Sequence, residues 1–167
     1  MNTLKPTVLA VLLSMIYASG KAQFQNSPPT FDFTRLVYHS SHCNGTCPAI
    51  DMEIDRNRNI LLHREIWSKK GETDENASGY FKGRLDADTY AELEHFLSNS
   101  GYYNWIWPED TCCDAVITTI IIHANGKRTR FISMTPPNEA KAFIDYLFEF
   151  GMNIKIPRTD QHLVIEK

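Results

Sequence analysis

The sequence predicts a small α+β domain, an antiparallel sheet of about six strands with two helices packed on one face. Apolar and polar residues alternate strictly from Ala49 to Asp55, which is typical of a strand with one solvent-exposed face. Asn125-Gly126 separates two β-prone runs and favours a tight hairpin. Two other segments repeat apolar residues at helical spacing. The predicted order, β-β-β-β-α-β-β-α, requires no parallel crossover.

The first four strands are expected before residue 86. Each is a short β-prone run bounded by turn-forming or polar residues. The polar segment from Ser68 to Ser78 separates the last two, and we interpret it as an exposed loop. The four predicted strands are Phe33–Tyr38, Ala49–Asp55, Ile60–Ile66 and Gly79–Leu85.

Both helices have recognisable ends. Asp86 is placed to cap a helix that runs to Ser98, and Gly101 suits its C-terminal stop. The second helix is expected to begin at Thr135-Pro136-Pro137, because proline is tolerated in a first turn, and to end at Gly151. The predicted buried stripes are Tyr90, Leu93, Phe96 and Leu97 in the first helix, and Ala140, Ile144, Leu147 and Phe148 in the second.

The hairpin around Asn125-Gly126 predicts which residues are buried. A two-residue turn pairs Ala124 with Lys127 and Ile120 with Phe131. The predicted core residues of this hairpin, whose first strand is expected to start near Ala115, are Val116, Ile120, Ile122 and Phe131. The opposite face shows His123, Arg128 and Arg130, which are placed to receive an anion. The alternative is an ordinary solvated sheet face.

The N-terminus has the order of a secretory signal peptide. Lys5 supplies a positive charge, Val8 to Tyr17 is almost uninterruptedly apolar, and small residues follow as far as Ala22. The apolar run is shorter than the ~20 residues that span a bilayer. We therefore expect a signal peptide over 1–22, a flexible lead-in over 23–30, one domain over 31–155 and a C-terminal tail over 156–167. The protein would be periplasmic or secreted, with no membrane span after cleavage.

The charge of the chain argues against two classes of partner. Cleavage after Ala22 removes Lys5 and Lys21 but no acid, so the formal net charge changes from −3 to −5. Nucleic-acid binding and binding to anionic membranes both depend on clustered positive charge. We expect neither for this mildly acidic domain.

Four cysteines follow the predicted signal peptide. Cys43 and Cys47 flank Asn44-Gly45-Thr46, a tight turn that brings their Cα atoms within bonding distance, so a local disulfide is favoured. Cys112 and Cys113 are neighbours in the sequence, and a bond between them would be strained. Their state and pairing stay open, including cross-links to the first pair.

Two alternatives use the first cysteine pair chemically. Cys43 and Cys47 could act as a thiol redox pair, although such cysteines usually begin a helix, whereas Pro48 and a predicted strand follow here. Together with His39 and His42 they could also hold a soft metal such as copper or zinc. The competing interpretation is that the two histidines are ordinary loop residues, and no metal or other cofactor is favoured.

The segment around the first cysteine pair resembles a bacterial family known only as a domain of unknown function. The shared signature is Cys-x-Gly-x-Cys-Pro, matched here by Cys43, Gly45, Cys47 and Pro48. Further matches follow at Gly79, Gly83, Leu85, Thr118, Ile120, Asn125, Gly126 and Lys127. The resemblance covers roughly residues 31 to 150 and implies a small exported protein, but no activity.

The functional expectation is a non-catalytic envelope module that binds a protein or ligand. The sequence contains no nucleophile elbow, phosphate loop or His-Glu-x-x-His motif. Two contact surfaces are candidates: the face with His123, Arg128 and Arg130, and the aromatic segment from Tyr102 to Trp107. An enzyme is not favoured, and the alternative function is thiol redox or soft-metal handling through Cys43 and Cys47.

Overall fold

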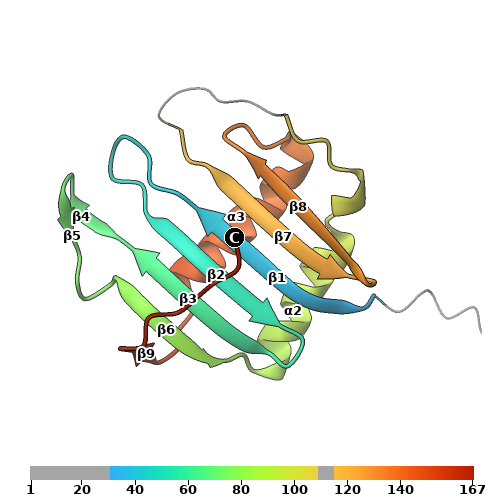
Figure 1. Ribbon diagram of the computed structural model, residues 1–167, viewed down its shortest axis with the longest axis horizontal. Coiled ribbons are helices and arrows are strands. Elements are labelled where there is room, and N and C mark those ends of the chain that lie inside the picture. The colour runs from blue at the N-terminus through green and yellow to red at the C-terminus, as the bar shows by residue number, and fades with distance from the viewer. Residues whose placement is uncertain (1–30, 109–114) are drawn as a thin grey trace, which may run out of the picture. The chain divides into compact units, whose positions relative to one another are not determined.

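The fold is α+β, as the sequence predicts: a seven-stranded antiparallel sheet with two helices on one face (Figure 1). The computed structural model describes residues 31–108 and 115–167. The strand order is β8-β7-β1-β2-β3-β6-β9, and every neighbouring pair is antiparallel. The strands are β1 (Phe33–Ser40), β2 (Ala49–Asp55), β3 (Asn59–Glu65), β6 (Gly79–Arg84), β7 (Thr118–Ala124), β8 (Lys127–Ser133) and β9 (Arg158–Thr159).

The core lies between the sheet and the helices α2 (Ala87–Asn99) and α3 (Asn138–Asn153). Strand alternation directs Ile50, Met52 and Ile54 of β2 to this inner face, where they are almost fully buried. Asp86 caps α2 by accepting a hydrogen bond from the Thr89 backbone N–H at 2.8 Å, as predicted. The predicted hairpin is also confirmed, because Asn125 and Gly126 have φ values of 53° and 71°.

Several sequence expectations about packing are wrong in detail. Val116 is only half-buried, because β7 begins two residues later. In α3, Phe143 is buried with Ala140 and Leu147, whereas Ile144 and Phe148 are only partly covered. In α2, Phe96 is 38% exposed and stacks on Tyr146 of α3. The helices therefore face the sheet with slightly different stripes from those that spacing alone indicates.

Two segments carry more structure than the sequence indicates. The polar segment after β3 contains a small second sheet, β4 (Trp67–Lys69) and β5 (Glu72–Thr73), with the positive-φ residue Gly71 between them. The sequence interpretation placed residues 156–167 in a tail beyond the domain. In the structure, β9 pairs with β6, and the residues after β9 pack on the face of the sheet opposite the helices. We call residues 160–167 the C-terminal strap.

Candidate binding site on the outer face of the sheet

The face opposite the helices, here called the outer face, carries a row of side chains set by strand register. Thr119, His39, Asp51, His63 and Tyr80 are successive cross-strand partners on β7, β1, β2, β3 and β6. Alternation sends all five to the same face, because they are directly opposite one another. The row crosses the five strands close to the ends of β1 and β2 that the cysteine loop connects.

An open pocket of about 550 Å³ lies over this row. His39, Asp51 and Thr119 form part of its floor, together with Ser40 at the end of β1 and Ala49 at the start of β2. Its remaining walls come from separate parts of the chain. These are Ser41, His42, His63, Glu65, Ile117, Arg130 and Lys167.

Asp51 is the central charged group of the pocket. Its Oδ1 lies 2.6 Å from Nδ1 of His39, and its Oδ2 lies 3.4 Å from Nδ1 of His63. Burial opposes ionisation of Asp51, but the hydrogen bonds from the two histidines outweigh it and hold its pKa far below the usual value. His63 is held further by stacking on Tyr80, with 4.4 Å between ring centroids. Asp51 is therefore a carboxylate between two oriented imidazoles.

His39 and His42 are both held by bonds at their two ring nitrogens. In His39, Nδ1 faces Asp51 and Nε2 lies 2.7 Å from the carbonyl oxygen of Glu166, so both bonds form only when both nitrogens carry a proton. In His42, Nδ1 accepts from the indole N–H of Trp67 at 2.9 Å, and Nε2 faces Glu65 at 3.2 Å.

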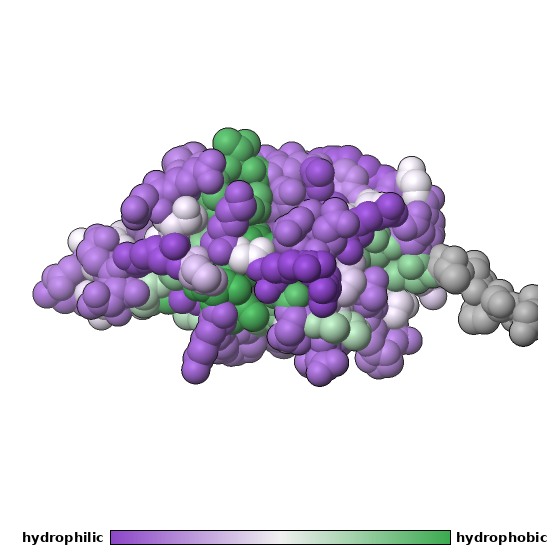
Figure 2. Space-filling model, turned by 90° about the horizontal axis from the view of Figure 1, so that it is seen from below, coloured by the Kyte–Doolittle hydropathy of each residue, from purple (hydrophilic) through white to green (hydrophobic). Residues whose placement is uncertain are grey.

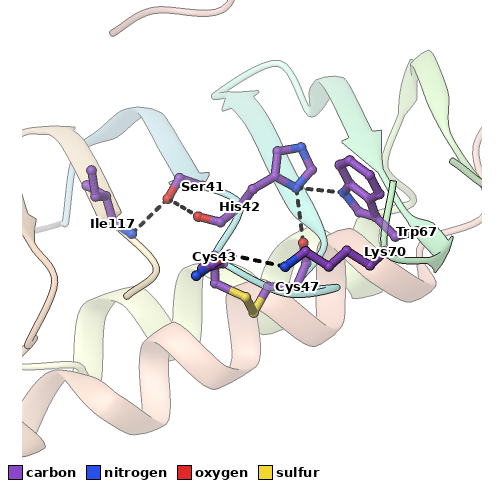
Figure 3. The surroundings of a disulfide bond; sticks show 8 residues. Ser41, His42, Cys43, Cys47, Trp67, Lys70 and Ile117 are labelled. Atoms are coloured by element: carbon purple, nitrogen blue, oxygen red, sulfur yellow. Dashed lines mark hydrogen bonds between the residues drawn. A yellow bond between two sulfur atoms is a disulfide. The ribbon is translucent and has the colours of Figure 1, made fainter. Parts of the chain in front are cut away.

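The cysteine loop forms one rim of the pocket and is closed by the Cys43–Cys47 disulfide, with 5.5 Å between the Cα atoms. Figure 3 shows the ring of His42 between the carbonyl of Cys47 and the indole of Trp67. Ser41 ties the loop to β7, because its backbone N–H and hydroxyl oxygen bond the carbonyl and N–H of Ile117 at 3.0 and 2.9 Å. The loop is thereby fixed against the strands on both sides of it.

The chemical alternatives for the cysteines receive no geometric support within residues 31–108 and 115–167. No three His, Cys, Asp or Glu side chains gather there as metal ligands, and both sulfurs of the first pair are bonded to each other. Cys47 is followed by Pro48 and β2, so neither cysteine begins a helix. Cys112 and Cys113 lie outside the described residues, as do the predicted signal peptide and lead-in.

The three cationic residues proposed from the hairpin lie on the outer face but in two settings. His123 Nε2 and Arg128 Nε each lie 2.8 Å from the carboxylate of Glu166 in the strap. Arg130 lines the pocket and has no ion-pair partner in the part of the chain that the structure describes. The anion at His123 and Arg128 is thus Glu166 of the same chain, whereas Arg130 has no such partner among the described residues.

The aromatic segment contributes mainly to the core. Trp105 is buried against Phe131 and Phe143, with ring centroids 5.3 and 6.0 Å away. Tyr103 and Ile106 remain exposed. This segment therefore covers the inner side of β8 and is not part of the outer face.

Sequence reasoning missed three residues of the site: Asp51, His63 and Glu166. Asp51 was placed on the exposed face of its strand, but its histidine neighbours follow only from cross-strand register. Glu166 belongs to a segment expected to lie outside the domain. A search for oppositely charged residues at paired outward positions would have found Asp51 and His63, whereas nothing in the sequence indicates where Glu166 lies.

The fold and the closed cysteine loop define a small α+β domain with a polar site on the sheet face opposite the helices. Residues 34–151 match the family described as domain of unknown function DUF6438, and the chain belongs to this family. No curated protein matches the chain. In the described part of the chain, no helix has the length and apolar character needed to cross a membrane.

Proposed function

We propose that this protein is an exported, non-catalytic binding module that receives an anionic ligand in the outer-face pocket. The observation that carries the proposal is the charge arrangement around that pocket. Asp51 faces His39 and His63, and Glu65 faces His42, so each carboxylate already has a partner. A ligand group entering this space therefore meets carboxylates that already face histidine rings.

The positively charged residues of the pocket have fewer partners than its carboxylates. Arg130 and Lys167 both line it, and the side chain of neither forms an ion pair within the described ranges. Thr119, on the floor of the pocket, adds a hydroxyl that donates to anions. Guanidinium and ammonium groups beside a half-enclosed space favour a carboxylate or phosphate over a cation.

Two of the three histidines that line the pocket, His39 and His42, are fixed in a way that favours binding over catalysis. A general base needs a nitrogen that is free to take a proton from its substrate. His39 uses both nitrogens in bonds to Asp51 and the strap, and His42 uses both in bonds to Trp67 and Glu65. The orientations of these two rings are therefore fixed, which suits recognition of a ligand of one particular shape.

Export is part of the proposal and is supported by two features. Residues 1–22 have the charge, apolar run and small residues of a secretory signal, and disulfides such as Cys43–Cys47 persist in oxidising compartments. Envelope-extracted protein is expected to begin at Gln23. N-terminal sequencing that finds Met1 would contradict export by cleavage.

The binding proposal is tested by NMR titration of the full domain with succinate, inorganic phosphate and, as a cationic control, ethanolamine. The two anions should shift the amide resonances of Thr119 and His63, while ethanolamine should leave them unchanged. Arg130→Ala should weaken anion binding by about tenfold, because it removes a charged hydrogen-bond donor. Lys127→Ala is the matched control, since Lys127 lies on the same strand but outside this pocket.

Two results would overturn the proposal. One is the absence of shifts around the pocket with both anions at millimolar concentration. The other is equal binding by the Arg130→Ala and Lys127→Ala proteins, which would mean that the anion binds elsewhere. Shifts confined to the pocket and lost only with Arg130→Ala support it.

A further inference from the structure

The C-terminal strap crosses the outer face without joining the sheet. Figure 1 shows this dark red segment running from β9 at the sheet edge across the front of the central strands. Residues 160–167 belong to no strand, so they form no ladder with the strands beneath them. Their contacts to the sheet are made by the side chains of His162, Leu163, Ile165 and Glu166, and by two main-chain groups of Glu166.

The apolar part of this contact is a small cluster separate from the core. Leu163 and Ile165 are each 8% exposed and pack against Val37 of β1 and Ile121 of β7. Val164, between them, is 85% exposed. This alternation is that of an extended peptide with one face on a surface. In the view from below, a narrow hydrophobic band is exposed among mainly hydrophilic residues (Figure 2).

The polar part is a carboxylate held by cations from three strands. Glu166 accepts from Nη1 of Arg35 at 3.2 Å, and lies 2.8 Å from both Nε2 of His123 and Nε of Arg128. Burial opposes ionisation of Glu166, but hydrogen bonds from Arg128 and His123 outweigh it and lower its pKa. Without this carboxylate, Arg35 would keep Glu53 as its ion-pair partner at 3.5 Å, whereas no other side-chain carboxylate among the described residues pairs with His123 or Arg128.

The backbone of Glu166 is recognised as well. Its N–H donates to Oε2 of Glu53 at 3.2 Å, and its carbonyl accepts from Nε2 of His39 at 2.7 Å. One residue thus has its side chain, its donor and its acceptor all engaged by sheet side chains. Contacts of this kind are typical of recognition of an extended peptide.

We propose that the outer-face groove is a docking site for an extended acidic segment of a partner protein, and that the strap occupies it as an internal competitor. By the groove we mean the part of the outer face that lies beneath the strap. It comprises the apolar residues Val37 and Ile121 and the cluster of Arg35, His123 and Arg128. The partner segment carries two apolar residues at alternate positions followed by an acidic residue, as in Leu163, Ile165 and Glu166. This inference goes beyond the proposed anion binding, because it concerns a different part of the outer face.

A protein segment fits this groove better than a small anion does. A free carboxylate or phosphate would fill the cationic cluster and leave Val37 and Ile121 uncovered, because only a chain also brings apolar side chains. The competition is intramolecular, since the strap is tethered at β9 and its effective concentration is of millimolar order. A partner segment therefore binds the native protein weakly unless the strap contact is loosened.

The experiment uses a fluorescent peptide with the sequence of residues 160–167 as the probe and the full-length protein as the receptor. Glu166→Gln in the receptor should raise peptide affinity by about tenfold over wild type, because it weakens the tethered competitor. Asp160→Asn is the matched control. It removes a strap carboxylate that has no ion-pair partner among the described residues, and should bind the peptide as wild type does.

Two further measurements separate the groove from the pocket. A peptide with glutamine in place of its glutamate should bind the Glu166→Gln receptor about tenfold more weakly, because it loses charge-assisted bonds. Adding Arg128→Gln to that receptor should abolish peptide binding, whereas adding Arg130→Ala should preserve it. Ile165→Ala provides a second loosened receptor if Glu166→Gln folds poorly, which circular dichroism would report.

No peptide binding by either loosened, folded receptor would overturn the inference, as would equal binding of the glutamate and glutamine peptides. Loss of binding through Arg130→Ala but not Arg128→Gln would also overturn it, since the peptide would then occupy the pocket. The proposed anion binding is judged separately, by the Arg130-dependent shifts with succinate and phosphate. Either hypothesis can therefore fail while the other stands.

Discussion

The inner face of the sheet packs against α2 and α3 through apolar side chains, whereas the outer face carries charged side chains under a single strap. The same strands supply both faces, since neighbouring residues of a strand point to opposite sides. Leu62 of β3 is fully buried inside, and His63 beside it lines the outer pocket. One face thus has the character of a core, and the other has the character of a site.

This difference indicates which contacts of the domain could be replaced by contacts with a partner. Removing an inner residue leaves a cavity in the core, because the surrounding side chains relax only partly to fill it. Releasing the strap would instead uncover Val37 and Ile121 together with the charged groups that contact Glu166. The proposed docking requires that the strap can leave the outer face without unfolding of the domain.

The largest expected effect compares two neighbours on β3. Leu62→Ala should lower the free energy of unfolding by about 2–5 kcal/mol, because Leu62 is fully buried in the core. Leu61→Ala should cost roughly 1 kcal/mol, since Leu61 is only partly buried beside the strap cluster. Urea denaturation of the two variants measures this. Equal losses would mean that the outer cluster is as tightly packed as the core.

The next effect concerns the loop at the rim of the pocket. The Cys43→Ser, Cys47→Ser double variant should lose about 2 kcal/mol, because a five-residue loop gains little from closure. The domain should still fold, since its core does not depend on the loop. Cys112→Ser, Cys113→Ser should cost less. Equal and large losses in urea midpoints would show that the two pairs are linked to each other.

A smaller effect is expected in the strap. Ile165→Ala should cost about 1–2 kcal/mol, limited by the free energy with which the whole strap docks. Val164→Ala, at the exposed position beside it, should change stability by less than about 0.5 kcal/mol. Hydrogen exchange should show faster exchange at the amide of Glu166 in the first variant only. Uniformly faster exchange throughout the sheet would mean that strap and sheet unfold together.

Most of the sheet could be predicted because local sequence determines it. Alternation in β2 assigns each residue to a face, and Asn125-Gly126 sets the β7–β8 register through its turn geometry. The strap could not be predicted, because its apolar and polar residues alternate over too few positions to distinguish it from a loop. Its position depends on contacts with residues more than a hundred positions earlier, such as Arg35 and Glu53.

The candidate site was predictable only where one element carries it. His123 and Arg128 belong to one hairpin, so their common face follows from the turn. The row of His39, Asp51 and His63 comes from three strands, and it requires the registers of two separate strand pairs. Sequence reasoning therefore gave candidate cations but not the carboxylates that pair with them.

The last expected effect is a pH dependence of stability to which Asp51 on the outer face contributes. The folded-state pKa of Asp51 lies well below the 3.8 of an unperturbed aspartate, since hydrogen bonds from His39 and His63 outweigh burial. The unfolded state therefore binds a proton first as pH falls. The stabilisation from ionised Asp51 is fully present above about pH 4 and is lost progressively as pH falls toward the folded-state pKa.

Asp51→Asn removes this contribution, so its stability should fall less steeply than that of wild type between about pH 4 and pH 2. Asp160→Asn is the control, because Asp160 is an exposed strap carboxylate that should not change the slope. Glu166 also titrates with a lowered pKa, so the informative quantity is the difference between the wild-type and variant curves. Urea midpoints measured at half-unit pH steps give that difference. Parallel curves for wild type and Asp51→Asn would mean that the two histidines do not stabilise the carboxylate, and the polar row would then be an ordinary solvated face.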